Sequence, residues 1–444
     1  VLAPPAWPGL ALLGAGAALA FAPAIGGLPL AAYGAVAALL FGGVALVPAV
    51  VHALLALLPT PRTALPLLAL QRARYQRRTA TAAVAGVVAS LALSVALTVM
   101  VTSFRDAVSA WLDTVLPADL YARSAASPDA GDQAWLAPGF VAAAARLPGV
   151  QRVAASRVTS LQLAPDRPAV TLIARDLAHP DRALPLLDVP LAPAPGEVRV
   201  YVSEAMVSLY GTRVGQDIAL PLGSAPLHAR VLGVWRDYAR QFGAVAIDAT
   251  AYRRLTGDAR VNDLAIWLAP GATAAEVQAR LRALLPDPAM LDLASTGELR
   301  ALSLRIFDRS FAVTYYLQAV AIAIGLVGIA ASLSAQVLAR RKEFGLLAHL
   351  GLTRGQVVAI VAGEGAAWMA AGTLVGLLLG IAVSLVLVFV VNPQSFHWTM
   401  PLVLPALRLA LLCGAVFGAG VATAAFGARR AAGRSAVLSV KEDW

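Results

Sequence analysis

The chain has 444 residues, of which 59% are hydrophobic and only 14% are charged. A soluble protein of this size needs more charged surface, so the composition excludes an ordinary soluble protein and indicates a membrane protein. The net charge of +10 does not indicate nucleic acid, because the block Asp106–Asp308 holds 19 basic and 21 acidic residues. The excess of basic residues flanks long apolar segments instead, as is typical of cytoplasmic loops.

Six segments are apolar enough to cross a bilayer, which takes about 20 residues. They are Gly9–Ile25, Leu30–Leu58, Thr79–Phe104, Phe311–Leu338, Val357–Val391 and Leu402–Ala428. The first is the weakest, because it is short, rich in Gly and Ala, and interrupted by Pro23. The sequence therefore predicts a polytopic α-helical membrane protein with six transmembrane helices.

The basic segments define one orientation. We expect Arg62–Arg78, Arg340–Arg354 and Arg429–Lys441 to be cytoplasmic, because Lys and Arg are retained on that side. This arrangement places both ends of the chain in the cytoplasm. It also makes the block between the third and fourth helices extracytoplasmic.

That block has the pattern of an inserted α+β domain. Alternating apolar residues predict strands at Gln151–Leu163, Ala169–Ala174, Val198–Val202, Ala229–Trp235, Ala244–Ile247 and Asp263–Leu268. Helices are predicted at Pro138–Leu147, Ser203–Tyr210 and Thr273–Leu285. We expect a β-rich middle, Val158–Thr256, inserted into an outer layer of helices and strands. The Ser203–Glu204 pair is more typical of a helix cap than of a nucleophile.

Small residues recur at helical spacing in two apolar segments. Gly86, Ser90, Ser94 and Thr98 recur every fourth residue in the third helix, and Gly372, Gly376 and Gly380 do so in the fifth. Such stripes allow close helix packing in lipid, an interpretation that we favour over a substrate path.

Ionisable residues are sparse in the apolar segments: only His52, Glu364 and Arg408 occur there. Secondary transporters usually carry such groups at mid-membrane. For Glu364 we favour a structural partnership with a backbone or interfacial group over transport chemistry.

The segment RRKEFGLLAHLGLTRGQV (Arg340–Val357) follows the fourth membrane helix. Phe344, Leu347 and Leu350 share one face of a short helix, which Gly351 can end, and Thr353 can cap the next helix. A helix of this kind suits docking into a groove of a partner protein. Periodicity alone is equally consistent with a helix that rests on lipid headgroups.

Several stretches resemble the FtsX-like permease family, the branch of ABC transporters that includes MacB and the lipoprotein-extracting permeases. Arg340–Val357 is similar to the family's coupling helix, and LALQRARYQRRTATAAV (Leu68–Val84) to its cytoplasmic elbow. GEGAAWMAAGTLVGLLLG (Gly363–Gly380), NPQSFHWTM (Asn392–Met400) and VLSVKEDW (Val437–Trp444) resemble its Gly-rich helix, outer turn and tail. VSEAMVSLYGTRVGQDIAL (Val202–Leu220) and VLGVWRDYARQFGAVAID (Val231–Asp248) resemble the MacB-like extracytoplasmic core.

This resemblance implies a domain organisation. Residues 1–60 would be two helices that end a preceding half of a duplicated ten-helix permease. Residues 61–105 would be the elbow and third helix, 106–308 the extracytoplasmic domain, and 309–428 the three-helix permease domain. The coupling helix would span 340–356, and 429–444 would be a cytoplasmic tail. The bacterial cytoplasmic (inner) membrane is the implied location.

The resemblance also implies partners. A cytoplasmic ABC ATPase dimer would bind the coupling helix and supply the ATP site, and a second permease copy or sister half would complete the transporter in membrane lipid. The implied contact residues are Arg340, Arg341, Lys342, Glu343, Phe344, Leu347, Leu350, Gly351, Thr353 and Arg354. The implied function is ATP-driven export or extraction of a lipid, lipoprotein or other envelope substrate. The alternative is an ATPase-coupled regulator of an extracytoplasmic enzyme such as a cell-wall hydrolase.

The sequence predicts no catalytic site, metal site or cofactor in this chain. His179 and His228 lie far apart without a Cys or paired His for zinc. The chain also lacks the GxxxxGK[ST] phosphate loop that ATP hydrolysis would require.

Overall fold

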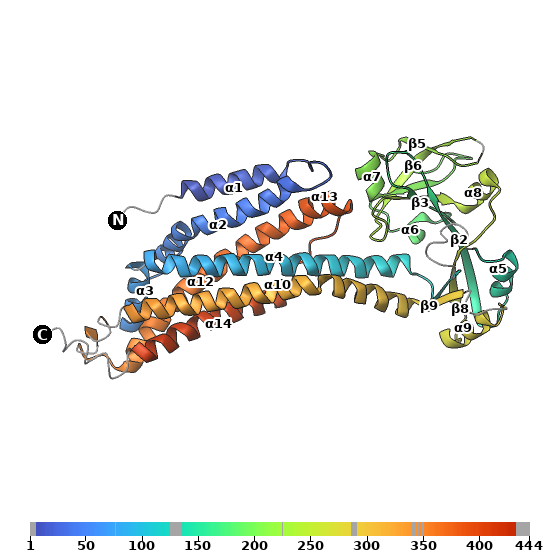
Figure 1. Ribbon diagram of the computed structural model, residues 1–444. Coiled ribbons are helices and arrows are strands. Elements are labelled where there is room, and N and C mark those ends of the chain that lie inside the picture. The colour runs from blue at the N-terminus through green and yellow to red at the C-terminus, as the bar shows by residue number, and fades with distance from the viewer. Residues whose placement is uncertain are drawn as a thin grey trace. The chain divides into compact units, whose positions relative to one another are not determined.

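The structure is a computed structural model, and it describes residues 6–75, 77–124, 135–223, 225–285, 291–339, 343, 346–347 and 350–431. The chain forms two compact units (Figure 1). The bundle unit comprises Val1–Phe104, Ser310–Ser395 and Met400–Trp444. The sheet unit comprises Arg105–Arg309 together with the short segment Phe396–Thr399.

Helices make up the described part of the bundle unit. They are α1 (Trp7–Ala20), α2 (Leu30–Leu57), α3 (Ala64–Tyr75), α4 (Arg77–Val115), α10 (Thr296–Ala339), α12 (Arg354–Val386), the π-helical turn η3 (Leu387–Val391), α13 (Asn392–Phe396) and α14 (Ala406–Ala431). α4 and α10 continue beyond the bundle into the sheet unit.

Five of the described helices are long and apolar enough to cross a membrane. These helical segments are Leu30–Leu57, Val84–Val115, Thr296–Gly328, Arg354–Phe396 and Ala406–Arg430. The first predicted span contains α1, which has only 14 residues. At 1.5 Å per residue α1 is about 21 Å long, shorter than the hydrocarbon core of about 30 Å. The chain is therefore polytopic, and the sixth span stays a prediction.

α4 and α12 form the centre of the bundle. Val87, Leu91 and Val95 of α4 are almost completely buried. The glycine stripe of α12 faces them: a Cβ on Gly376 would lie 3.1 Å from Leu91, and one on Gly380 would lie 2.6 Å from Val95. The absence of side chains at these glycines brings the two helices close together.

The polar stripe of α4 lies on another side of the helix. A Cβ on Gly325 of α10 would collide with Ser90, and Gln318 of α10 donates a 2.6 Å hydrogen bond to Thr98. Ser94 donates to the backbone of its own helix. Gly86 departs from the predicted packing, because it is exposed and nothing lies within 4 Å of the position where its Cβ would be.

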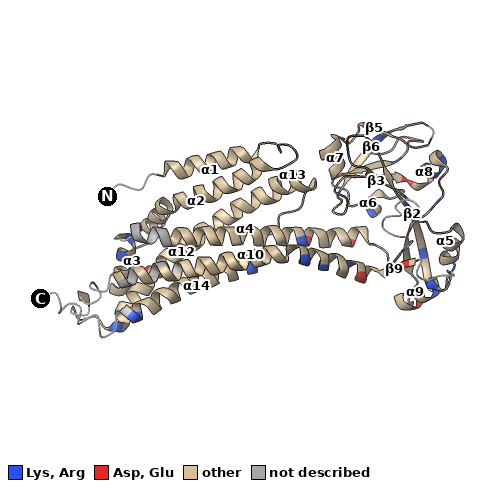
Figure 2. Cartoon of the chain, viewed as in Figure 1, with Lys and Arg blue, Asp and Glu red and all other residues tan. Residues whose placement is uncertain are grey.

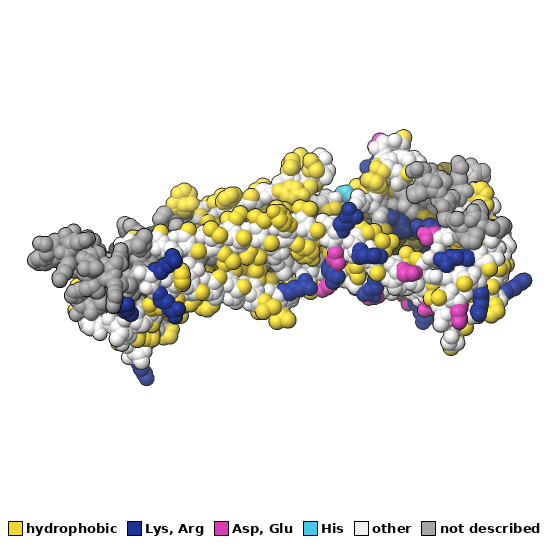
Figure 3. Space-filling model, turned by 60° about the horizontal axis from the view of Figure 1, so that its bottom comes forward, with side chains coloured by type: hydrophobic (Ala, Val, Ile, Leu, Met, Phe, Trp, Pro, Cys, Tyr) yellow, Lys and Arg dark blue, Asp and Glu magenta, His cyan; other side chains and the backbone are white. Residues whose placement is uncertain are grey.

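Charge and hydrophobicity are segregated within the bundle unit. Arg72 and Arg74 lie in the last turn of α3, and Arg429 and Arg430 in the last turn of α14 (Figure 2). Hydrophobic side chains cover the face of the bundle seen in Figure 3. Exposed apolar residues on its helices include Val327, Leu378 and Leu411. This distribution is typical of a helix bundle surrounded by lipid.

The sheet unit is built on one mixed sheet of nine strands in the order β5-β6-β4-β7-β3-β2-β8-β1-β9. The strands are β1 (Leu120–Ser124), β2 (Val150–Leu161), β3 (Val170–Arg175), β4 (Val200–Ser203), β5 (Asp217–Leu220), β6 (Leu227–Trp235), β7 (Ala244–Asp248), β8 (Asp263–Leu268) and β9 (Leu291–Ser295). The β3–β7 and β4–β6 pairs are parallel, and the other pairs are antiparallel.

The long strand β2 joins the two halves of this sheet. Residues 150–156 pair with β8, and residues 157–161 pair with β3. The helices of the unit are α5 (Pro138–Ala145), α6 (Pro180–Ala183), α7 (Glu204–Tyr210), α8 (Ala249–Thr256) and α9 (Ala274–Arg282). The six predicted strands and three predicted helices are confirmed, whereas β1, β5, β9, α6 and α8 were not predicted.

Candidate functional site

The predicted docking segment is bounded by two local caps. Gly351 has a positive φ of 93°, and Leu352 N–H donates to the Leu347 carbonyl at 3.2 Å. This six-to-one bond across a left-handed glycine is the Schellman arrangement that ends a helix. Thr353 and Gln356 then form a reciprocal capping box at the start of α12. The predicted helix end at Gly351 and cap at Thr353 are confirmed.

The apolar residues of this segment do not share one environment. Leu347 is half-buried and packs against the cluster of Val357, Val361 and Ala428. Leu350 is 71% exposed, and Arg354 is also exposed. A partner can therefore contact Leu350 without any rearrangement of the segment, whereas the side chain of Leu347 already packs against other residues of the bundle unit. Arg340, Arg341, Lys342 and Phe344 lie outside the described residues.

A charged cluster connects α3, the docking segment and α12. Arg72 donates a 2.9 Å hydrogen bond to Glu343, and its Nε lies 3.5 Å from Oε2 of Glu364. Glu343 is half exposed, whereas the side chain of Glu364 is 1% exposed. Glu364 thus acts as a counter-ion for an arginine from another element, which satisfies a carboxylate that would otherwise be costly to bury.

α3 is held on both sides by further hydrogen bonds. Arg74 donates to the Leu55 and Leu58 carbonyls at 2.8 and 2.7 Å, which satisfies the C-terminal end of α2. Trp368 of α12 donates to the Ala73 carbonyl at 3.2 Å. The elbow predicted at Leu68–Val84 therefore contains a helix fastened to both α2 and α12.

A second site lies within the sheet unit, around the turn Phe396–Thr399 that follows α13. Thr399 donates to Oε1 of Glu204 through its hydroxyl at 2.6 Å and to Oε2 through its N–H at 3.2 Å. Arg236 donates to the same hydroxyl at 3.1 Å, and Tyr238 donates to the Thr399 carbonyl at 3.1 Å. The hydroxyl, N–H and carbonyl of Thr399 are therefore all bonded to residues of the segment Arg105–Arg309.

Aromatic rings surround this contact. Trp398 is 4% exposed and packs edge-on against Tyr238, with 4.6 Å between the ring centroids. Trp111 of α4 packs on the same tyrosine and donates to the Arg236 carbonyl at 3.0 Å. Burial raises the pKa of Tyr238 to about 12, so its hydroxyl remains a donor at neutral pH.

His397 fixes the shape of the turn. It has φ of 63°, the left-handed region that residues with a Cβ rarely occupy. Its Nδ1 lies 2.8 Å from the Ser208 hydroxyl of α7, and burial lowers the pKa of its imidazole. The turn Phe396–Thr399 thus binds α7 and the loop after β6.

This second site was not predicted from the chemistry of the sequence. Asn392–Met400 was identified only by resemblance, and Ser203–Glu204 was interpreted as a cap. Ser203 occupies the N-cap position of α7, but its hydroxyl makes no cap bond and accepts from Ala244 N–H, while Glu204 binds Thr399. The pairing of Glu204 with Thr399 spans 195 residues, so no local pattern could reveal it.

Comparison with known proteins identifies both units. Residues 317–436 match the FtsX-like permease C-terminal family model, and residues 80–284 match the MacB-like periplasmic core domain. The chain belongs to the FtsX-like ABC transporter permease family. The permease is also 28% identical over 327 residues to an uncharacterized ABC transporter permease protein of Mycobacterium tuberculosis. That alignment covers 72% of this chain but only 38% of the relative.

A solved structure also shows a weak likeness to the permease. The extracellular domain of the noncanonic ABC-type transporter YknZ from Gram-positive bacteria is 14% identical, with a TM-score of 0.29. The match covers 39% of the permease and 98% of that domain. A score this low does not support a fold assignment.

No group of three or more His, Cys, Asp or Glu side chains able to hold a metal occurs among the residues that the structure describes. The two sites consist instead of ion pairs, caps and aromatic contacts between elements. Such contacts hold the elements of the protein together.

Proposed function

We propose that this permease transmits the closure of a cytoplasmic ABC ATPase dimer to its extracytoplasmic domain, and so drives export or extraction of a lipid, lipoprotein or other envelope substrate. ATP would be bound and hydrolysed by the partner. A second permease copy or sister half would complete the assembly. Membership of the FtsX-like family supports this proposal.

The observation that carries the proposal is a helical path between the two sites. α12, η3 and α13 run without a break from Arg354 to Phe396, a stretch of 43 residues. At 1.5 Å per residue this path is about 65 Å long. It begins at the Thr353 cap and ends at the turn whose Thr399 is bonded to Glu204, Arg236 and Tyr238.

We expect this path to be stiff enough to carry a displacement. Close packing of Gly376 and Gly380 on α4 supports it through its middle. The π-helical turn Leu387–Val391 is its local irregularity, and such turns often mark functional positions in helices. A shift at Arg354 would therefore reach the turn instead of being absorbed by a flexible loop.

The ATPase would act on the exposed part of the docking segment. Leu350 offers an apolar contact, and Arg354 offers a charge that complements an acidic rim. Arg72 and Glu343 connect the segment to α3, and Glu364 connects α3 to α12. Displacement of the segment would therefore move α12 and α3 together.

Co-purification with the candidate ATPase tests this contact. We expect the ATPase to co-purify with the wild type and with Leu350→Met, and to be lost with Leu350→Asp, because a charge would enter an apolar groove. The thermal unfolding of Leu350→Asp should match that of the wild type, since the side chain is exposed. Retained ATPase binding and stimulation in Leu350→Asp would show that this face is not the docking surface.

Complexes of the permease and ATPase reconstituted into proteoliposomes test whether ATP hydrolysis drives transport. Release of lipid or lipoprotein from proteoliposomes on ATP addition is the result expected of a transporter. An active ATPase that moves neither, but activates a cell-wall hydrolase added outside, would overturn transport in favour of a regulatory role.

A further inference from the structure

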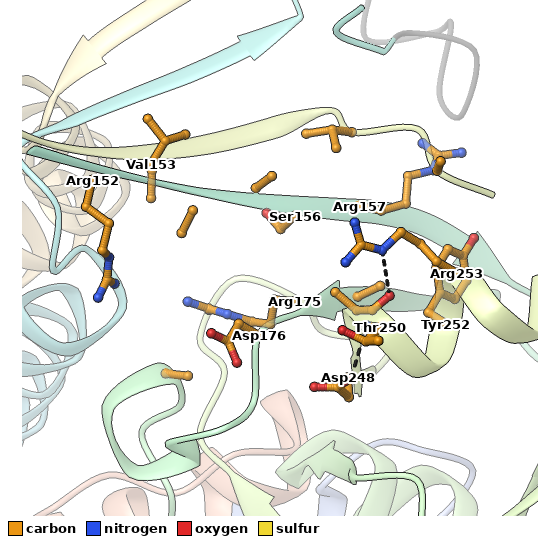
Figure 4. Close-up of a pocket in the computed structure, with 18 of the residues that line it drawn as sticks. Arg152, Val153, Ser156, Arg157, Arg175, Asp176, Asp248, Thr250, Tyr252 and Arg253 are labelled. Carbon is orange, nitrogen blue, oxygen red and sulfur yellow. Dashed lines mark hydrogen bonds between the residues drawn. The ribbon is translucent and has the colours of Figure 1, made fainter. Parts of the chain in front are cut away.

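The sheet unit contains a cavity of about 600 Å³ that is lined by no residue of the helical path Arg354–Phe396. It lies among β2, β3, β8 and the helices α6 and α8 (Figure 4). Six arginines line it, with His179 and only three aspartates. The volume lies within the range of small-molecule sites, about 300–1,000 Å³.

The three aspartates are already engaged. Asp258 accepts from Arg157 and Arg260, and hydrogen bonds from these arginines hold the pKa of its carboxyl well below the usual range. Asp248 caps α8 by accepting from two backbone N–H groups. Asp176 accepts from Ala178 N–H. These carboxylates therefore offset only part of the positive charge.

The remaining arginines form no ion pair within 4 Å with a carboxylate of the described residues, although Asp176 interacts electrostatically with Arg175 from a longer distance. They are Arg152, Arg175, Arg182 and Arg253. Figure 4 shows Arg152 on β2 and Arg175 at the end of β3 on opposite sides of the same open space. The guanidinium of Arg152 stacks 3.8 Å above the ring of Trp267, which fixes its plane.

Arg175 is the most informative of these groups. It is half-buried, and within the described part of the chain it makes no hydrogen bond or ion pair. Burial lowers the pKa of its guanidinium, so the folded protein holds a charge that is poorly solvated. A cation in such a position is stabilised by an anion that brings acceptor oxygens into the cavity.

We propose that this cavity is a binding site for a ligand that carries a phosphoryl group. Arg175 and Arg152 bind the phosphoryl oxygens, because the planar guanidinium presents paired donors that match phosphate geometry. Tyr252 and Trp267 supply walls for the rest of the ligand. The cavity is much larger than inorganic phosphate, so a glycerol phosphate or a phospholipid headgroup fits the same chemistry.

This site is independent of the proposed function. None of its residues belongs to the docking segment or to the turn Phe396–Thr399. Ligand binding can therefore be measured without an ATPase, and loss of coupling would not affect it.

Isothermal titration calorimetry on the full permease in maltoside detergent tests the site. The soluble probes are inorganic phosphate and glycerol 3-phosphate, and the lipid probe is short-chain phosphatidylglycerol with phosphatidylcholine as its comparison. The variants are Arg175→Gln, Arg175→Lys and Arg152→Gln. Arg213→Gln, an exposed arginine outside the cavity, is the matched control.

We expect Arg175→Gln and Arg152→Gln each to weaken binding about tenfold, as loss of one charge-assisted contact predicts. Arg175→Lys should weaken it less, and Arg213→Gln should leave it unchanged. Binding of glycerol 3-phosphate would identify a soluble source, and binding of phosphatidylglycerol alone a lipid source. The proposal is overturned if no probe binds, or if the two cavity variants bind as tightly as the wild type. Near-ultraviolet circular dichroism verifies that each variant is folded.

Discussion

At the scale of single residues, Thr399 makes four hydrogen bonds that hold the turn to the rest of the sheet unit. Its hydroxyl donates to Glu204 and accepts from Arg236. Thr399→Val keeps the shape of the side chain but leaves the buried carboxylate with one donor fewer. We expect a loss of about 1–3 kcal/mol in the stability of this contact, the usual effect of an unsatisfied buried polar group.

Hydrogen–deuterium exchange of the backbone at 395–400 measures this effect. Thr399→Val should exchange faster there, while Thr399→Ser, which keeps the hydroxyl, should resemble the wild type. If Thr399→Ser exchanges as fast as Thr399→Val, the methyl group and not the hydroxyl holds the turn.

His397 gives the same contact a dependence on pH. Burial lowers the pKa of its imidazole below the usual value of about 6.5, so the folded state favours the neutral ring. The stabilisation is present above the pKa of the unfolded chain and is lost as the pH falls towards the lower folded value. We expect the protection factors of the turn, which correct for the intrinsic slowing of exchange in acid, to fall as the pH is lowered from 7.5 to 5.5, with a flatter profile for His397→Gln. His228→Gln, at an exposed position on β6, should keep the wild-type profile.

The sequence predicted the features of these sites that depend on neighbouring residues, but it did not predict which residues distant in the chain contact each other. The Gly351 and Thr353 caps depend on neighbours within five residues, so their chemistry can be read directly. The Arg72–Glu343 hydrogen bond joins residues 271 positions apart. Only the fold brings such groups together, and therefore the role of Glu204 was missed.

At the scale of elements, the glycine stripe of α12 determines how closely it approaches α4. A Cβ on Gly380 would lie 2.7 Å from the Ala92 carbonyl oxygen, and a backbone atom cannot move aside cheaply. Gly380→Val should therefore destabilise the bundle by about 1–3 kcal/mol through overpacking. Thermal unfolding in detergent measures the change.

Gly86→Ala is the matched control for Gly380→Val. Gly86 has open space around it, so the substitution should be neutral or stabilise the helix by up to about 1 kcal/mol. A strongly destabilised Gly86→Ala variant would indicate that a second copy or another subunit packs on that face.

The prediction of strands followed the clarity of their apolar patterns. β2, β6 and β8 carry sustained apolar alternation, and the short β4 and β7 are nearly continuous apolar runs, so all five were predicted. β1 and β9 are equally short but contain charged residues, and they pair with each other. Short strands of this kind form because the neighbouring sheet offers unpaired backbone groups, which a single sequence does not reveal. α1 was predicted as a span from composition, although its 14 residues make it short.

At the scale of the whole molecule, three connections of the chain join the bundle unit to the sheet unit: α4, α10 and the turn after α13. Within the sheet unit the ends of α4 and α10 are fastened by ion pairs of Arg105 with Asp308 and of Arg300 with Asp113. The turn is fastened separately, through Thr399. Under the proposed function, movement in the bundle unit would reach the sheet unit through one or more of these three connections.

This arrangement predicts that coupling can be broken without loss of the ATPase. In a complex with the proposed ATPase partner, Thr399→Val should keep subunit association and basal hydrolysis, because the docking segment is unchanged. The difference in sheet-unit hydrogen exchange between the ATP-analogue and nucleotide-free states should be lost, whereas Thr399→Ser should retain it. Leu350→Asp should instead lose association itself. If Thr399→Val preserves the nucleotide-dependent difference, the movement passes through α4 and α10, and the turn serves only to hold the sheet unit.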